Sequence, residues 1–179
     1  MLSHPEDAPV RIRPILATSL LAAFACTGPT AANAPAGSAP SAASAGAIAS
    51  QGFDWVDATK SAGPLASQLV AAARAATASG RQPIAYLHAD WCPPCNAIDA
   101  TIHDPQMAAA FAGTYVLRID HDAFTTELAG VGLDVGALPT LVKLDDEGRS
   151  TGATIAGGAW GDNVPENMAP PLRAFFTQG

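Results

Sequence analysis

The sequence predicts an α/β fold, a three-layer α/β/α sandwich in which helices cover both faces of a mixed central sheet. Three observations support this prediction. Short apolar runs alternate with stretches of helical periodicity from residue 52 onward. The run at residues 84–87 (IAYL) is apolar throughout, which is typical of a strand buried on both faces. The acidic stretch at residues 145–148 (DDEG) separates two further apolar runs and predicts an antiparallel hairpin.

The first elements are a strand at residues 53–56 and a helix over residues 64–79. Pro64 suits the first turn of that helix, and Gly80 ends it. Its apolar stripe consists of Leu65, Leu69, Ala72 and Ala73. The strand at residues 84–87 follows and leads into a segment with two cysteines.

The rest of the domain continues this alternation. The expected elements are a helix that opens at the cysteine segment, a helix from Asp104-Pro105 through Phe111, a strand at 115–119, a short helix at 124–128, paired strands at 141–144 and 151–155, and a final helix at 165–176. The order is β-α-β-α-β-α-β-β-α, with parallel crossovers first and an antiparallel hairpin last. The apolar helix residues expected in the core are Met107, Phe111, Met168, Leu172, Phe175 and Phe176.

The N-terminal residues resemble an export signal. Arg11 and Arg13 form a short positive region before an apolar stretch at residues 15–25, which is shorter than a membrane-spanning helix. This pattern predicts that residues 1–26 are a signal peptide or a lipoprotein leader, and that the protein is exported to the bacterial periplasm. The alternative is a disordered N-terminus with an apolar patch.

Two processing sites compete in this region. Residues 23–26 (AFAC) are an imperfect match to a bacterial lipobox, in which Cys26 would carry the lipid. Residues 32–34 (ANA) resemble a site of ordinary cleavage, although Pro35 follows it. The sequence leaves lipidation and cleavage open, and either one leaves the mature domain with two cysteines.

Residues 27–51 consist almost entirely of Ala, Ser, Gly, Pro and Thr, which predicts a flexible linker before a folded domain at residues 52–179. The net charge of the chain is −7, and its basic residues are scattered. These properties argue against nucleic acid as a partner, and against membrane contact other than through a lipid anchor.

The two cysteines of the domain, Cys92 and Cys95, lie where a buried strand passes into a helix. The first turn of a helix offers free N–H groups and a positive partial charge, which stabilise a thiolate. Cys92 is therefore the expected nucleophile. Cys95 is three residues further along the same helix face and can resolve a mixed disulfide on Cys92.

Pro93 and Pro94 separate the cysteines. They suit the first turn of a helix, but they remove two N–H donors near the sulfur of Cys92. Weaker stabilisation of the thiolate makes the reduced form less favoured. The sequence therefore predicts a reducing couple.

The cysteine pair has three other conceivable roles: a zinc half-site, a structural disulfide, and a copper or thiol carrier. None of the four histidines completes a second ligand cluster for zinc. A purely structural disulfide is disfavoured, because a loop of four residues constrains the unfolded chain little. A copper or thiol carrier that uses Cys92, Cys95 and His88 stays open, since thiolates bind Cu(I) well.

Four segments resemble the thioredoxin-like superfamily. Residues 86–95 (YLHADWCPPC) resemble the thioredoxin active-site segment, and residues 136–140 (GALPT) match the family's cis-proline loop. Residues 145–148 match the turn after that loop. Residues 101–106 (TIHDPQ) resemble the C-terminal domain of the transmembrane thiol:disulfide interchange proteins, which pass electrons to the bacterial periplasm. The resemblance covers residues 52–179 and implies a thioredoxin fold and a dithiol–disulfide oxidoreductase.

The resemblance also implies supporting residues around the cysteines, beside Pro93 and Pro94. Pro139 would be cis and would lie against the cysteine pair. Leu138 would offer main-chain hydrogen bonds to an extended peptide. Trp91 would flank the site and shield the sulfurs, or would simply belong to the core.

The chain departs from the family at three positions. Tyr86 stands where thioredoxins have a buried Asp that helps to deprotonate the resolving cysteine, and Val116 stands where they have the Lys that pairs with it. Asp90, His88 or water could replace this missing base. Alternatively, Asp90 is a solvated loop carboxylate and His88 is a hydrogen-bonded structural residue. Asn96 replaces a frequent Lys, which puts docking to a typical thioredoxin reductase in doubt.

Two further segments have structural interpretations. Residues 120–122 (DHD) resemble a metal-binding tripeptide, but are expected to end a strand and cap a helix. Residues 157–163 (GGAWGDN) form a long loop, in which Trp160 would gate the site, contact a partner or form a lid over the last helix.

These observations predict an exported thiol-disulfide oxidoreductase, with disulfide reduction as the favoured direction. It would need no metal and no cofactor beyond the Cys92–Cys95 pair. Its partners would be protein or small-molecule disulfides and an upstream electron donor. The alternatives are an oxidase or isomerase of the same fold, and a non-catalytic thiol or copper carrier.

Overall fold

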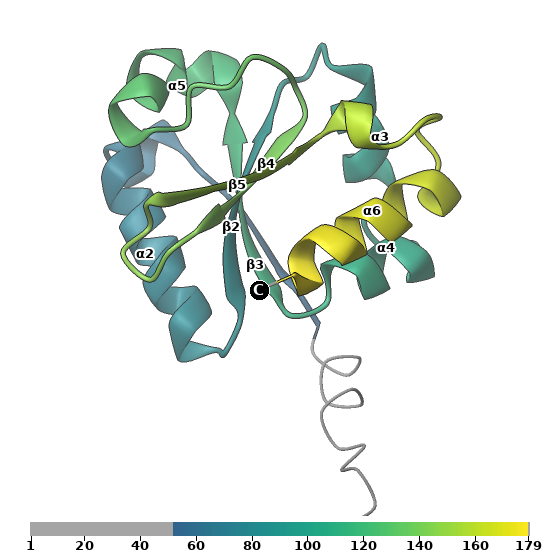
Figure 1. The fold of residues 1–179 in the computed structure, drawn as a ribbon. Coiled ribbons are helices and arrows are strands. Elements are labelled where there is room, and N and C mark those ends of the chain that lie inside the picture. Colours follow the sequence, from purple (N-terminus) through teal and green to yellow (C-terminus); the bar gives the residue numbers. More distant parts are fainter. Residues whose placement is uncertain (1–51, 179) are drawn as a thin grey trace, which may run out of the picture. The chain divides into compact units, whose positions relative to one another are not determined.

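A computed structural model describes residues 52–178, so the predictions for residues 1–51 lie outside the described part of the chain. The described residues form a mixed sheet of five strands with helices on both faces (Figure 1). The order of the strands across the sheet is β1-β3-β2-β4-β5. This arrangement confirms the predicted three-layer α/β/α sandwich.

The bounds of the elements agree with the predicted ones to within three residues. The strands are β1 (Asp54–Asp57), β2 (Gln82–His88), β3 (Thr114–Asp120), β4 (Thr140–Leu144) and β5 (Ser150–Ala156). The α-helices are α2 (Leu65–Ala78), α3 (Pro93–Thr101), α4 (Pro105–Phe111), α5 (His121–Leu128) and α6 (Pro165–Thr177). The 3-10 turns are η1 (Lys60–Ala62), η2 (Ala129–Val131) and η3 (Gly157–Ala159). Within the described residues, no helix is both long enough and apolar enough to cross a membrane.

The sheet combines parallel and antiparallel pairs, as predicted. Strands β1 and β2 flank β3 and run parallel to it, whereas β4 runs antiparallel to both β2 and β5. The register of β2 and β3 places Tyr86 opposite Arg118 and His88 opposite Asp120. The carboxyl ends of these strands therefore meet at one edge of the sheet, which is where open α/β folds place their sites.

Two apolar clusters pack on the sheet, one on each face. Helices α3, α4 and α6 cover the first, which includes Ile84, Tyr86 and Phe111 (Figure 1). Helices α2 and α5 cover the second, which includes Leu69 and Leu87. Because successive side chains of a strand point to opposite faces, the continuous apolar run of β2 contributes to both clusters.

Aspartates cap two of the helices. The Asp104 carboxylate accepts a hydrogen bond from the Gln106 amide at 2.8 Å at the start of α4. The Asp120 carboxylate accepts bonds from the amides of Asp122 and Ala123 at 2.9 and 3.2 Å at the start of α5. These bonds satisfy free N–H groups of the first turn. They confirm that residues 120–122 end a strand and cap a helix.

The last helix differs in part from the prediction. Met168 and Leu172 are fully buried, but Phe175 and Phe176 are only partly buried. The two phenylalanines lie in the last turn of α6 and pack against the edge of the first apolar cluster. Phe176 still packs on the ring of Phe111, with ring centroids 4.9 Å apart.

Candidate active site

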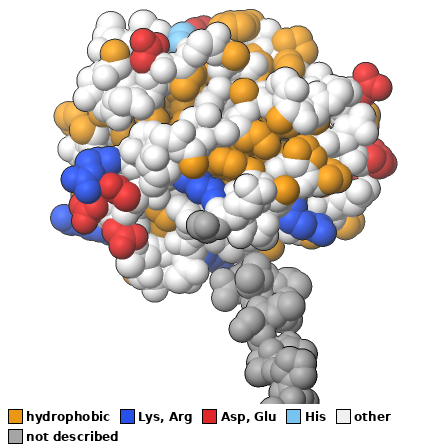
Figure 2. Space-filling model, in the orientation of Figure 1, with side chains coloured by type: hydrophobic (Ala, Val, Ile, Leu, Met, Phe, Trp, Pro, Cys, Tyr) orange, Lys and Arg blue, Asp and Glu red, His pale blue; other side chains and the backbone are white. Residues whose placement is uncertain are grey.

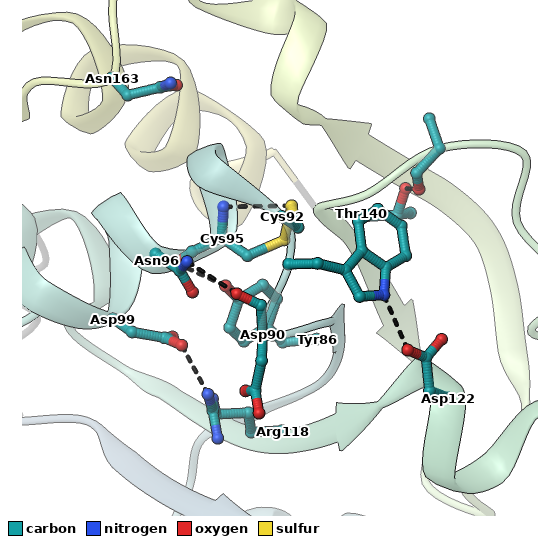
Figure 3. Close-up of a disulfide and its surroundings, with 12 residues drawn as sticks. Tyr86, Asp90, Cys92, Cys95, Asn96, Asp99, Arg118, Asp122, Thr140 and Asn163 are labelled. Atoms are coloured by element: carbon teal, nitrogen blue, oxygen red, sulfur yellow. Dashed lines mark hydrogen bonds and ion pairs between the residues drawn. A yellow bond between two sulfur atoms is a disulfide. The ribbon is translucent and has the colours of Figure 1, made fainter.

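The two cysteines form a disulfide at the start of α3. Their sulfurs are 2.10 Å apart and their Cα atoms 5.3 Å apart. Cys92 is the N-cap residue of the helix, and its sulfur accepts a hydrogen bond from the Cys95 amide at 3.3 Å (Figure 3). Both residues are buried, because the loop before the helix and the apolar residues Ala89 and Leu138 pack around them.

The two prolines limit the number of backbone amides that can donate a hydrogen bond to the Cys92 sulfur. Pro93 and Pro94 occupy the first two positions of α3 and carry no N–H group. Among the first three residues of the helix, only Cys95 can therefore donate a backbone hydrogen bond to the Cys92 sulfur. A single donor is left where a helix without these prolines would offer three.

The loop before β4 lies against the cysteines. The Leu138–Pro139 peptide bond is cis, as the resemblance implies, and Leu138 packs against the cysteine pair. Gly157 of η3 donates its amide hydrogen to the Pro139 carbonyl oxygen at 3.0 Å. A Cβ atom at Gly157 would lie 2.8 Å from Pro139 Cδ and 3.6 Å from Pro94 Cβ. Three segments that are distant in the sequence thus converge at the disulfide.

Trp91 stands at the surface beside the cysteines. Its side chain is 65% exposed, so the alternative that places it in the core is wrong. Its indole N–H donates a hydrogen bond to the Asp122 carboxylate at 2.7 Å (Figure 3). Hydrogen bonds from His121 and from Trp91 hold the pKa of Asp122 below its ordinary value. The first turn of α5 therefore fixes an exposed aromatic ring next to the disulfide.

Trp160, unlike Trp91, is buried. Its side chain is 7% exposed and belongs to the apolar cluster that contains Met168 and Leu172 of the last helix. Its indole N–H donates a hydrogen bond to the Asn163 side-chain oxygen at 3.1 Å. Burial against α6 agrees with the interpretation of the 157–163 loop as a packed lid.

Tyr86 and Val116 depart from the pattern of the superfamily that the chain resembles. The sequence predicted these departures, but not what the two side chains contact. Tyr86 is buried, and its hydroxyl donates a hydrogen bond to the Cys95 carbonyl oxygen at 3.2 Å. Burial, followed by the charge of Asp99, raises the pKa of Tyr86. Val116 is a core residue opposite Ile84, and it leaves the Lys position apolar.

A partly buried ion pair beside Tyr86 was missed in the sequence. The Arg118 guanidinium donates to the Asp99 carboxylate at 2.6 Å (Figure 3). It also donates to the Asp57 carboxylate at 3.2 Å. Arg118 is the one charged residue within the apolar run YVLRI, and Asp99 lies four residues after Cys95 on the same helix. These two positions were the features of the sequence from which the ion pair could have been predicted.

Asp90, Asn96 and His88, the other three residues considered near the loop between β2 and α3, differ in their burial and hydrogen bonds. Asp90 is exposed, and its carbonyl oxygen accepts a hydrogen bond from the Asn96 side chain at 2.9 Å. His88 is buried, and its Nδ1 atom has no hydrogen-bond partner among the described residues. The interpretation of His88 as a hydrogen-bonded structural residue is therefore wrong for this nitrogen. Among the described residues, no three His, Cys, Asp or Glu side chains group as metal ligands would.

Apolar side chains gather on the molecular face drawn in Figure 2, and Lys and Arg side chains stand both within this face and at its edge. The described chain has basic side chains away from the cysteines, for example Arg81 just before β2, Lys143 on β4 and Arg149 in the turn before β5. The residues at and after the ends of β2 and β3 are instead acidic or neutral, and include Asp90 after β2, Asp120 at the end of β3 and Asp122 in the first turn of α5. The edge of the sheet with the disulfide therefore carries no Lys or Arg in these two connections.

Comparisons with known proteins gave structural matches only. No protein-family model and no curated protein sequence matches the chain. The chain is similar to the structure of Trxlp from Edwardsiella tarda EIB202, at 18% identity over 69% of this chain and 100% of that chain, with a TM-score of 0.45. It is also similar to a disulphide isomerase from Xylella fastidiosa Temecula1 (22% identity, 62% and 86% of the two chains, TM-score 0.48). A third match is a thioredoxin mutant from Halobacterium salinarum NRC-1 (18% identity, 71% and 93%, TM-score 0.42).

Proposed function

From the thioredoxin-like fold of residues 52–178 we infer that the protein is a dithiol–disulfide oxidoreductase that acts through Cys92 and Cys95. The observation that carries this proposal is the disulfide at the first turn of α3, which the cis-Pro139 loop contacts on one side. A helix start lowers the pKa of a thiol, and the adjacent cysteine can exchange disulfides with it.

The reaction follows from the order of the two cysteines. The Cys92 thiolate attacks one sulfur of a substrate disulfide, and the other substrate sulfur leaves with the electron pair of the broken bond. The Cys95 thiolate then attacks the Cys92 sulfur and expels the second substrate sulfur. The substrate gains two electrons and becomes a dithiol, while the protein returns to the disulfide form. No cofactor takes part in either step.

Disulfide reduction is the proposed direction. Pro93 and Pro94 leave the Cys95 amide as the single donor from the first three helix residues to the Cys92 sulfur. Fewer donors stabilise the thiolate less, so the reduced protein is a better electron donor. Turnover then needs an upstream protein that reduces the Cys92–Cys95 disulfide. An oxidase or isomerase of the same fold is the alternative direction.

The proposed location is the bacterial periplasm, with residues 1–26 as a signal peptide or lipoprotein leader. This part of the proposal depends on the sequence pattern of residues 15–26, including the lipobox-like segment with Cys26. Labelling of the full chain with a radioactive fatty acid in bacteria tests lipidation, and Cys26→Ser is the matched control. Recovery of the protein in the cytoplasmic fraction with an uncut N-terminus would contradict export.

The decisive experiment for the function is the reduction potential of the full chain, measured by thiol trapping in glutathione buffers. A potential at or below about −230 mV would support a reductase, since thioredoxin lies near −270 mV. A potential above about −180 mV would make the protein an oxidase or isomerase, since a strong periplasmic oxidant lies near −120 mV. Cys92→Ser and Cys95→Ser are the controls, and only Cys95→Ser should accumulate a mixed disulfide. A pair that does not cycle but retains Cu(I) would favour the carrier.

A further inference from the structure

The ring of Trp91 and the carboxylate of Asp122 are joined beside the reactive sulfur, and we call them the Trp–Asp unit. The indole N–H donates a hydrogen bond to Asp122 Oδ2 at 2.7 Å (Figure 3). His121 Nδ1 lies 3.0 Å from Asp122 Oδ1 and is the donor there, because an ionised carboxylate only accepts. Trp91 directly precedes Cys92 in the chain, and Asp122 belongs to the first turn of α5. The unit therefore joins two connections at the edge of the sheet that carries the disulfide.

Both parts of the Trp–Asp unit are accessible to a ligand. Trp91 is 65% exposed, and the Asp122 side chain is 56% exposed. Hydrogen bonds from His121 and from Trp91 hold the pKa of Asp122 below its ordinary value, so the carboxylate is ionised at neutral pH. Among the described residues, no Lys or Arg forms an ion pair with it. Because a cation is attracted both by the face of an indole ring and by a carboxylate, the two groups together can bind one.

The charges around the unit have one sign. The three segments that border the disulfide contain no Lys or Arg, and they are residues 89–107, 119–142 and 150–172. Lys60 follows β1 and Arg118 lies two residues before the end of β3, so both are near this edge of the sheet. Each is already paired, Lys60 with Glu127 at 2.5 Å and Arg118 with Asp99 at 2.6 Å. A substrate at the disulfide therefore meets negative charge that no nearby basic side chain offsets.

The loops on the other side of the disulfide present small neutral residues. Gly136 and Ala137 are exposed just before Leu138, which packs against the cysteine pair. Gly158 and Ala159 are exposed just after Gly157, whose amide is bonded to the Pro139 carbonyl oxygen. Side chains of this size leave room for an extended polypeptide to lie across the Cys92 sulfur, with the Trp–Asp unit beside it.

We propose that the Trp–Asp unit binds a Lys or Arg side chain of the substrate, so that the protein selects disulfide-bonded polypeptides with a basic residue next to the reacting cysteine. This inference rests on the proposed function and names its substrate class. The mixed disulfide ties the substrate cysteine to Cys92, and consecutive Cα atoms are about 3.8 Å apart, so the neighbouring substrate residue comes close to Trp91. Its cationic group lies on the indole face and pairs with the Asp122 carboxylate. An acidic residue at the same place is repelled by Asp122 and by the exposed Asp90.

A set of peptide disulfides that differ only in charge tests the selection. The probes are acetylated and amidated tetrapeptides Ala-Xaa-Cys-Ala, with Arg, Gln or Glu as Xaa, each oxidised to its symmetric disulfide. The reduced full chain reacts with each probe at about pH 8, where an ordinary imidazole is neutral, and thiol trapping after an acid quench gives the second-order rate constant. Each constant is divided by that of dithiothreitol with the same probe, which removes differences in intrinsic reactivity. The Arg probe should react about 5-fold faster than the Gln probe, and the Glu probe about 5-fold slower.

Variants of the unit separate recognition from a merely structural role, because the readout is the ratio of the Arg to the Glu rate within each protein. Asp122→Asn keeps an acceptor for the indole N–H but removes the charge, and it should lose most of the preference. Asp122→Glu keeps the charge and should retain it. Asp146, an exposed residue of the hairpin turn at the opposite edge of the sheet, provides the matched control, and Asp146→Asn should keep the full preference. Ionic strength of about 0.5 M should shrink the wild-type ratio, since salt screens exposed charges.

Three outcomes would count against this selection, and they are distinguishable. Equal corrected rates for the three probes with the wild-type chain would overturn the inference and leave the proposed function standing. Equal losses of the preference in Asp122→Asn and Asp146→Asn would assign it to the overall negative charge of the chain, and would also overturn the inference. A wild-type chain that reduces none of the probes would instead refute the proposed function, and the inference would fall with it. Far-ultraviolet circular dichroism identifies any variant that does not fold, and the wild-type ratios decide without a variant.

Discussion

Gly157 lies so close to Pro139 that a side chain at position 157 would collide with the proline ring. The Gly157 amide donates to the Pro139 carbonyl oxygen at 3.0 Å, and a Cβ atom at Gly157 would lie 2.8 Å from Pro139 Cδ. The same Cβ would lie 3.6 Å from Pro94. The η3 turn, the loop before β4 and the start of α3 are therefore packed together, and the shape of the candidate site depends on this contact.

Gly157→Val should impair both stability and disulfide exchange. The added side chain must displace Pro139, and such overpacking typically costs about 1–3 kcal/mol. Urea denaturation measures the loss, and the rate of disulfide reduction should fall with it because the loop beside the cysteines moves. Gly158→Val is the matched control, since no atom lies within 4 Å of a Cβ there. Equal effects of the two substitutions would argue against a specific contact with Pro139.

Replacement of the prolines between the cysteines should make the couple more oxidising. Pro93→Ala and Pro94→Ala each restore an N–H group in the first turn of α3, near the Cys92 sulfur. A hydrogen bond to a charged group contributes about 1.5–3 kcal/mol, which raises the reduction potential by roughly 30–60 mV. The pKa of Cys92, followed by thiolate absorbance, should fall in parallel.

Pro105→Ala is the control for this experiment, because Pro105 also begins a helix but lies away from the cysteines. Its potential should equal that of the wild-type chain. A wild-type Cys92 pKa as low as that of a strong oxidant would contradict the role assigned to the prolines.

The Trp91–Asp122 hydrogen bond should weaken in acid. The pKa of Asp122 is lowered by hydrogen bonds from His121 and Trp91, so the carboxylate contributes stability above its ordinary pKa of 3.8. That contribution disappears as the pH falls through the lowered value. The fluorescence of Trp91 should then show a transition below pH 3.8 that Asp122→Asn removes. Asp134→Asn, at another exposed carboxylate, should leave the transition in place.

The Arg118–Asp99 ion pair should contribute to stability as well as to the site. Both side chains are 23% exposed, and removal of one partner leaves a mostly buried charge. Arg118→Met should therefore lower the free energy of unfolding by about 1–3 kcal/mol. Arg149→Ala removes ion pairs of a 72% exposed side chain and should lower the stability less than Arg118→Met does. Urea denaturation of both variants measures their free energies of unfolding. A larger loss of stability in Arg149→Ala than in Arg118→Met would contradict this prediction.

Predictions that depend on nearby residues in the chain were confirmed. The apolar run at residues 84–87 is the central strand β2, because apolar side chains at consecutive positions serve both faces of a sheet. Asp104 and Asp120 cap helices, because a carboxylate bonds the amides two or three residues ahead of it. Helix α3 begins at the cysteine motif, as predicted, because proline is compatible with the first turn of a helix.

Predictions that depend on distant contacts were incomplete. A tryptophan at a strand–helix junction can be buried or exposed, and only the position of α5 decides that Trp91 is bonded to Asp122 at the surface. The sequence shows a missing base at Tyr86, but it does not show that Asp99 and Arg118 lie beside it. Those two residues are 19 positions apart and meet only when α3 packs on β3.

The sequence by itself determined the element order, the three-layer fold, the two-residue spacing between Cys92 and Cys95 and the N–H donors that the prolines remove. Each of these follows from side-chain periodicity or from the geometry of a single helix turn. The tertiary structure alone decided what surrounds the cysteines: Gly157 against Pro139 on one side, and Tyr86 beside the Arg118–Asp99 ion pair on the other. These contacts join segments that are far apart in the chain, and their distances depend on strand register and on how the layers pack.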